Sequence, residues 1–336
     1  MSVSDEPQRA MSGEDRLIAR YFRPLARAPG AFGLTDDAAV LEPPPGWDVV
    51  LKTDPIISGV HFFPDDPPEA VARKALRVNL SDLAAKGATP AGFLLALALP
   101  PQISERWLAQ FAQALGEDAD RYQCPLLGGD TDATPGLLTV SITAFGLVPH
   151  GTMVLRNGAK AGDQVVVSGT VGDAALGLRL RRAAPGSPAP DARVREHLLA
   201  RYQIPEPRTG LAQTLRRYAS AAMDISDGLA GDLSKLCRAS GVSAQINTAE
   251  LPLSQAARSM LDTAPGLLDT VLTGGDDYEL LCTIPSAHLV DFRAAASATG
   301  IAVTVIGQVV AGLMDPRFTD ARGAPRSFER PSFSHF

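Results

Sequence analysis

Residues 74–90, KALRVNLSDLAAKGATP, predict most of a long helix that begins at Pro68 and ends near Gly87. A wholly apolar run follows at 93–99, which is typical of a buried strand. A helix beside buried strands indicates a mixed α/β architecture. Further outward, the patterns predict a strand at 48–53, a helix at 104–122, a strand at 137–148, and a strand at 164–168 that leads into a helix from Asp173.

The chain has 336 residues, which suits two domains of ordinary size. The strand pattern of the first half stops at a Pro and a Gly near 149–151. We therefore expect an N-terminal domain at 1–149 and a C-terminal domain at 150–336, both α/β (α+β) with mixed sheets. The Pro- and Ala-rich segment 183–192 is typical of an exposed loop within the second domain.

Composition excludes several classes of protein. The net charge of -6 gives no basic footprint for nucleic acid or for an anionic membrane. The N-terminus lacks the apolar core of a signal peptide, and no apolar run is long enough to span a bilayer. The 3 cysteines lie far apart, which argues against a disulfide framework or a zinc knuckle. These features predict a globular cytoplasmic protein.

Carboxylates concentrate in six short segments that also contain Gly, Ser, Thr or a second Asp. The segments are 36–37, 53–54, 81–82, 129–132, 224–228 and 275–279. Taken singly, each Asp has a simpler interpretation as a helix cap or a turn residue. Together they would repel one another strongly unless cations lay among them, and oxygen ligands favour Mg²⁺ or Ca²⁺ over zinc. The set predicts a metal-centred site of the kind that nucleotide-dependent phosphoryl transfer needs.

Other motifs leave more than one interpretation open. The sequence has no Walker A motif, no Gly-rich dinucleotide fingerprint and no protein-kinase signature, so an ATP site would have to depend on metal ions. His61 among apolar residues and Arg156 in LRNGA would, taken singly, be a buried structural histidine and a surface arginine. A weak internal repeat relates NLSDLA at 79–84 to DISDGLA at 224–230. It is consistent with two related halves and also with chance.

As an ordered set, the motifs resemble the thiamine-monophosphate kinase family of the aminoimidazole-ribonucleotide synthetase superfamily. They are GLTDDAAV (33–40), TD (53–54), GVHF (59–62), KALRVNLSDLAAKGATP (74–90), LLGGDT (126–131), LRNGAKAGD (155–163), DISDGLAGDL (224–233) and GGDDYEL (274–280). The resemblance implies phosphorylation of thiamine monophosphate by ATP, several Mg²⁺ ions, and a homodimer that pairs the N-terminal sheets. It also implies an active site in the cleft between the domains and direct in-line attack by the substrate phosphate.

The resemblance also implies roles for individual residues. Metal ligation is implied for Asp37, Asp54, Asp82, Asp130, Asp224 and Asp227, with an oxygen of Thr53. Nucleotide contacts are implied for Gly129, Asp130, Arg156 and Ser226, and substrate contacts for His61, Asp276 and Phe333. The chemical step itself is assigned to Asp130, Asp224, Asp227 and Arg156.

Four positions depart from the family pattern. Thr35 replaces a usual Gly, Lys52 a usual small residue, Asp276 a frequent Glu, and Phe333 a frequent Tyr. Lys52 lies next to Thr53-Asp54, and its side chain either points to solvent or places an ammonium group among the carboxylates; we favour the second. The alternatives to a thiamine-phosphate kinase are another ATP-using enzyme of the superfamily, such as aminoimidazole-ribonucleotide synthetase or selenophosphate synthetase, and a non-catalytic homologue.

Overall fold

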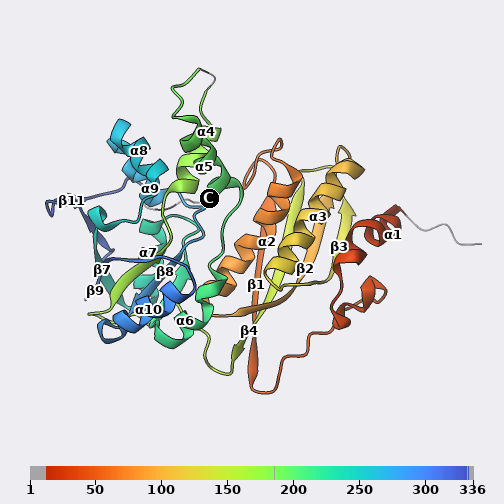
Figure 1. Ribbon diagram of the computed structural model, residues 1–336, viewed down its shortest axis with the longest axis horizontal. Helices are drawn as coiled ribbons and strands as arrows, with labels where there is room; N and C mark the ends of the chain where they lie inside the picture. Colours follow the sequence, from red (N-terminus) through yellow and green to blue (C-terminus); the bar gives the residue numbers. More distant parts are fainter. Residues whose placement is uncertain (1–12, 185, 331, 333–336) are drawn as a thin grey trace, which may run out of the picture.

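Two β-sheets organise the protein, whose computed structural model describes residues 13–184, 186–330 and Ser332. Figure 1 shows the two sheets beside each other, with helices packed against both. In each sheet one strand pair is parallel, β2 with β3 and β7 with β10, and the other pairs are antiparallel. The predicted mixed α/β class is confirmed. No helix in the described part of the chain is both long enough and apolar enough to cross a membrane.

The first sheet has the strand order β1-β4-β2-β3. Its strands are β1 (Trp47–Ile57), β2 (Thr89–Leu99), β3 (Leu126–Ala133) and β4 (Thr139–Pro149). In β4, buried and partly exposed residues alternate along the whole strand, as the sequence predicted. The buried set, Val140, Ile142, Ala144 and Val148, belongs to the core that α2 (Pro68–Ala85) and α3 (Glu105–Arg121) complete. The opposite face of this sheet is therefore its outer face.

Helix α2 is buried on nearly all sides. Pro68 occupies its first turn, where a missing N–H costs no hydrogen bond, and Gly87 follows its end with a φ of 71°. Leu76 and Leu80 are buried as expected, but so are Lys74, Asn79 and Ser81. The reason is that α2 contacts β1 and β4 of the first sheet and also β6 and β8 of the second. Polar groups on α2 therefore lie between the two halves of the chain.

A charged pair fixes α3 to α2. Ser104 caps α3, because its hydroxyl accepts a hydrogen bond from the Trp107 N–H at 3.1 Å. Near the other end, the buried Asp118 carboxylate accepts two hydrogen bonds from the Arg77 guanidinium, at 2.6 and 2.9 Å. This two-pronged pair fixes the relative position of the two helices.

The second sheet has the order β11-β10-β7-β9-β5-β8-β6. Its strands are β5 (Gln164–Ser168), β6 (Ala221–Asp224), β7 (Val242–Asn247), β8 (Leu280–Ile284), β9 (Val303–Ala311), β10 (Arg317–Thr319) and β11 (Pro325–Arg326). The remaining α-helices are α1 (Gly13–Leu17), α4 (Asp173–Arg181), α5 (Ala192–Gln203), α6 (Ala212–Tyr218), α7 (Leu229–Ser240), α8 (Gln255–Thr263), α9 (Leu268–Thr273) and α10 (Leu289–Ala298). The edge strand β6 contacts α2, and its last residue, Asp224, accepts a hydrogen bond from the Ser81 hydroxyl of α2.

The sequence-based elements agree with this architecture, but strand β1 continues to Ile57, four residues past its predicted end. Strand β2 begins at Thr89, four residues before the predicted start, because its pairing with β4 continues across an irregularity between Pro90 and Gly92. The two segments of the weak internal repeat differ in local structure, because Asp82 lies within α2 whereas Asp227 lies in the loop after β6.

Candidate active site

An acidic cluster lies where β1 and α2 meet the second sheet. Lys52 and Asp54 share one face of β1, and Asp82 lies in the last turns of α2. The Lys52 ammonium is 3.1 Å from Asp54 Oδ2 and 2.9 Å from Asp82 Oδ2. Of the two possibilities for Lys52, the structure therefore confirms the one that places its charge among the carboxylates. Burial lowers the pKa of Lys52, but Asp82 and Asp54 more than offset this and raise it overall.

The second half adds Asp224 to this cluster. Asp224 ends β6, is buried, and accepts a hydrogen bond from the Ser81 hydroxyl of α2 at 2.8 Å. Burial raises the pKa of Asp224 well above its usual value, the charge of Asp82 adds to this, and the Ser81 hydrogen bond opposes it. Burial likewise raises the pKa of Asp54, against the effect of Lys52. A further cation nearby would stabilise the charged form of each of these carboxylates.

The donor set at this place fits a hydrated magnesium ion. The Asn79 amide nitrogen donates to the Ala75 carbonyl at 3.0 Å, which fixes the amide orientation. The amide nitrogen also donates to the main-chain carbonyl of Asp54 at 3.5 Å, whereas Oδ1 is buried and has no hydrogen-bond partner within the described residues. A buried acceptor of this kind calls for a water or a cation. Among residues 13–184, 186–330 and 332, no three His, Cys, Asp or Glu side chains converge as a preformed metal site.

Ser226 and Asp227 follow β6 in a loop held by α7. The Asp232 carboxylate accepts hydrogen bonds from the Ser226 and Asp227 N–H groups at 3.0 and 2.9 Å. Lys235, one turn further along α7, forms ion pairs with Asp227 and Asp232. The charge of Asp227 contributes to the raised pKa of Asp54, so the loop is electrostatically part of the same cluster.

Two basic side chains border the cluster. The Lys86 ammonium, just past the end of α2, donates to the Ala222 carbonyl of β6 at 2.7 Å. The segment before β5 is tied to both halves, since the Val154 N–H donates to the Lys86 carbonyl and the Ala222 N–H donates to the Leu155 carbonyl. Arg156, the next residue, has an exposed side chain. Burial and the charge of Arg156 lower the pKa of Lys86 to about 8.

The depressed pKa of Lys86 makes stability depend on pH. Between a pKa of about 8 in the fold and the usual 10.5, the unfolded chain keeps a proton that the folded chain has lost. The free energy of unfolding should therefore rise with pH in this window, by up to about 1.4 kcal/mol per pH unit. Lys86→Met should lack this rise, so the wild type should gain stability relative to the variant from pH 8 to 10.5. Urea denaturation at several pH values measures it, and parallel curves for the two proteins would contradict it.

Asp37, Gly129 and Asp130 lie together, but on the outer face of the first sheet. They line a cavity of about 730 Å³ with apolar residues of β2 such as Leu94 and Ala96. Gly129 has a φ of 157°, and a Cβ atom there would lie 1.8 Å from the Leu95 carbonyl oxygen, so no other residue fits. Thr35 directly precedes Asp36 and Asp37. Its φ of -112° is accessible to any residue, so the backbone here does not require the glycine that is usual in the family.

Strand register shows why this cavity is separate from the first cluster. Asp130 lies beside Ala96, which lies beside Ser141 on the outer face, whereas Asp54 lies beside the buried Ile142. Asp54 and Asp130 thus lie at similar heights along their strands but on opposite faces of the sheet. Three strand spacings also separate β1 from β3, a distance of about 14 Å. Thr53 also faces outward: its hydroxyl donates to the Ile142 carbonyl and accepts from the Thr143 hydroxyl. Its side chain is not placed with Asp54 and Asp82.

His61 and Asp276 are brought together by a buried lysine of α2. Lys74 is 2% exposed, and its ammonium donates to the His61 carbonyl at 2.9 Å and to Asp276 Oδ2 at 2.7 Å. The same ammonium lies 4.1 Å from the centre of the Tyr202 ring. The Tyr278 hydroxyl donates to the other Asp276 oxygen at 3.3 Å. One cation therefore joins the first half of the chain to the loop before β8.

The DISDG and GGDDYE motifs lie side by side. The Asp276 N–H donates to the Ser226 carbonyl at 2.8 Å, and the Tyr278 N–H donates to the Ile225 carbonyl at 2.9 Å. Gly275 has a φ of 74°, and a Cβ atom there would lie 2.3 Å from the Ser226 carbonyl oxygen. The close approach of the two loops therefore requires glycine at this position.

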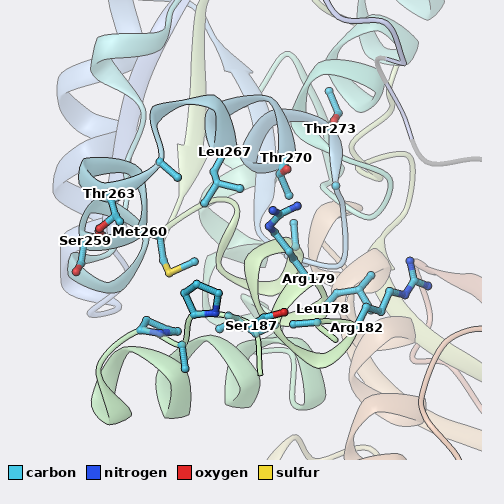
Figure 2. A pocket seen from close by; sticks show the side chains of 18 of the residues that line it. Leu178, Arg179, Arg182, Ser187, Ser259, Met260, Thr263, Leu267, Thr270 and Thr273 are labelled. Atoms are coloured by element: carbon cyan, nitrogen blue, oxygen red, sulfur yellow. The ribbon is translucent and has the colours of Figure 1, made fainter. Parts of the chain in front are cut away.

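A larger cavity of about 1770 Å³ lies beyond the Asp276 loop. Figure 2 shows side chains of α4, α8 and α9 around it, among them Arg179, Met260 and Thr270. Gly274 and Ser332 also line it, and they are close in sequence to the predicted substrate residues Asp276 and Phe333. Phe333 itself lies outside the described residues.

Comparison with known proteins identifies the family. Residues 35–148 and 160–314 match the N-terminal and C-terminal domains of AIR synthase related protein. A protein of Caulobacter vibrioides named thiamine-monophosphate kinase is 44% identical over 310 residues, which cover 91% of this chain and 86% of that protein. The chain belongs to the thiamine-monophosphate kinase family.

Solved structures of the thiamine-monophosphate kinase family agree with the fold. The crystal structure of the enzyme from Stenotrophomonas maltophilia K279a has a TM-score of 0.81 at 38% identity, covering 93% of this chain and 96% of that one. A structure described as AaThiL complexed with AMPPCP and TMP has a TM-score of 0.76 at 31% identity, covering 91% and 97%. The resemblance read from the motifs is confirmed, and this level of similarity favours a thiamine-phosphate kinase over the other superfamily enzymes.

Three residues near the predicted site of this thiamine-monophosphate kinase family member had no functional role in the sequence-based prediction. Lys74, Asn79 and Lys86 all lie on or just beyond α2, within the segment used to predict the helix. A signal was available in the residue types, because a lysine and an asparagine within a buried helix are costly without a partner. What the sequence could not indicate is that α2 would be covered on both sides.

Proposed function

We propose that the protein transfers the γ-phosphoryl group of ATP directly to the phosphate of thiamine monophosphate, giving thiamine diphosphate and ADP. The observation that supports this most is the meeting of Asp54 and Asp82 from the first half with Asp224 from the second, bordered by Lys86 and Arg156. Carboxylates that need cations, next to basic groups suited to phosphate, are what metal-dependent phosphoryl transfer requires.

Bound Mg²⁺ would neutralise the charge that the phosphate oxygens carry and develop. We infer that Asp82, Asp224 and Asp227 would hold such ions on the inner side, with Asp54 and the Asn79 amide oxygen beside them, and that Asp37 and Asp130 would do so in the outer cavity. Carboxylate and amide oxygens are suitable ligands. Because Gly129 has no side chain, a phosphate group of the nucleotide could approach the backbone of β3 closely.

The nucleophile needs no strong base in this proposal, because a phosphate oxygen is already anionic near neutral pH. The protein's contribution is then positioning and charge neutralisation. Arg156 and the Ser226 hydroxyl would orient the nucleotide, since a guanidinium can bind phosphate with two hydrogen bonds. His61 and Asp276, held by Lys74, would orient thiamine monophosphate, with Phe333 offering an aromatic face to its cationic ring.

We also propose two domains, 1–149 and 150–336, with the active site between them, and a homodimer that pairs the first sheets. The outer face of β1 supports the dimer: Trp47, Val49 and Leu51 alternate along it and are 37%, 37% and 65% exposed. An apolar sheet face of this kind is suited to burial against a second copy. Light scattering of the purified protein tests the proposal, which a monomer at micromolar concentration would contradict.

The decisive experiment measures ATP turnover with and without thiamine monophosphate, together with the product by ³¹P NMR. We expect ADP and thiamine diphosphate in equal amounts, and turnover that requires both Mg²⁺ and thiamine monophosphate. Asp276→Asn should raise the KM for thiamine monophosphate more than the KM for ATP, because the change weakens the Lys74 contact on the substrate side. Turnover that is indifferent to thiamine monophosphate would overturn the proposed function.

A further inference from the structure

Lys52 makes contacts that a divalent cation would otherwise make. Its ammonium lies within 3.1 Å of one oxygen of Asp54 and one oxygen of Asp82, so these two oxygens are at most about 6 Å apart. One carboxylate belongs to β1 and the other to α2. The lysine thus joins a strand to a helix through its charge, while its own side chain is 29% exposed.

Charged groups on β1, on or next to α2, and on β6 interact with this ammonium group. Asp54 lies on its own strand, Asp82 and Lys86 lie on or next to α2, and Asp224 lies at the end of β6. Removing the lysine would leave Asp54 and Asp82 facing each other, with Asp224 close to Asp82. Carboxylates this close repel unless a positive charge separates them.

We propose that the Lys52 ammonium is a permanently attached cation that occupies one cation position of the acidic cluster, so that the cluster needs one divalent ion fewer. The inference rests on the proposed function in one respect, that Mg²⁺ binds among these aspartates. A primary ammonium is a compact point charge with three donors, so it can hold two carboxylates and still contact a phosphate oxygen. The Asp54 side of the cluster would then be organised before any metal or nucleotide binds.

The first measurement is thermal stability without nucleotide, in EDTA and in millimolar Mg²⁺. The wild type should gain some stability from Mg²⁺ at its remaining cation positions, but less than either Lys52 variant gains. Lys52→Ser and Lys52→Met should melt lower in EDTA and regain most of the loss in Mg²⁺, because a metal ion can then separate the carboxylates. Lys160→Ser, at an exposed lysine outside the cluster, is the matched control and should behave like the wild type.

The second measurement counts bound metal. Mn²⁺ bound in the presence of AMPPCP, followed by electron paramagnetic resonance, should be one ion per chain higher for Lys52→Ser than for the wild type. Adding Asp54→Asn to Lys52→Ser removes one of the two facing charges, so the double variant should lose the extra ion and the Mg²⁺ response. Equal ion counts and equal Mg²⁺ responses in the wild type and both single variants would overturn the inference. Neither measurement uses thiamine monophosphate, so failure of the proposed reaction would be seen separately, in the turnover assay.

Discussion

Asp82→Asn and Asp130→Asn should each lower thiamine-monophosphate-dependent turnover of ATP by more than about 100-fold. This loss is larger than the usual effect of replacing a residue that only hydrogen-bonds to a metal ligand. Both changes keep the size of the side chain and remove a negative oxygen ligand. Asp82 lies in the inner cluster and Asp130 in the outer cavity, so loss of activity in both variants would mean that catalysis uses both faces of the first sheet.

The two variants should differ little from the wild type in stability. Asp82 is partly exposed and Lys52 keeps Asp54 as a partner, so the loss of this ion pair should cost less than about 1 kcal/mol. Asp132→Asn is the matched control: Asp132 lies two residues from Asp130 on the same strand, is exposed, and should leave turnover unchanged. Near-normal activity of either test variant would refute its role in metal binding.

Glu279→Ala should destabilise the protein by about 3–5 kcal/mol, the usual cost of breaking a buried ion pair from one side. Glu279 is fully buried and holds two arginines: Arg208 Nε donates to Oε2 at 2.7 Å, and Arg201 donates to Oε1 at 3.1 Å. The Ser168 hydroxyl donates to Oε2 at 2.6 Å. The deletion would leave both guanidinium groups largely buried without this carboxylate.

The same arginines provide a matched control. Glu206 is 53% exposed, and its carboxylate is 3.4 Å from Arg208 and 3.7 Å from Arg201. Because water screens this contact, Glu206→Ala should cost less than about 1 kcal/mol. Glu279→Gln keeps the shape and should fall between the two. Urea denaturation of the three variants at pH 7 measures this order, and equal losses for Glu206→Ala and Glu279→Ala would contradict it.

Much of the local structure was determined by the sequence itself. Alternation along 137–148 predicted the strand β4, Pro68 and the apolar spacing predicted α2, and Ser104 marked the start of α3. These patterns succeed because strand and helix periods are properties of the backbone and require no knowledge of the partner surface. The ordered motifs likewise identified the family, since they record residue types that the chemistry requires wherever the chain places them.

Only the tertiary structure decided how the acidic residues are grouped. In sequence, Asp54, Asp82, Asp130 and Asp224 are equivalent Asp residues in short polar segments, but register places Asp130 and Asp54 on opposite faces of one sheet. The contact of α2 with both sheets brings Ser81 to Asp224 and Lys74 to Asp276, across more than a hundred residues of chain. The sequence also allowed Lys52 to point to solvent. The ion pair between Lys52 and Asp82 depends on the packing of α2 against β1, which only the tertiary structure shows. The physical reason is that charge interactions depend on distance through space and on burial, and neither is contained in the spacing of residues along the chain.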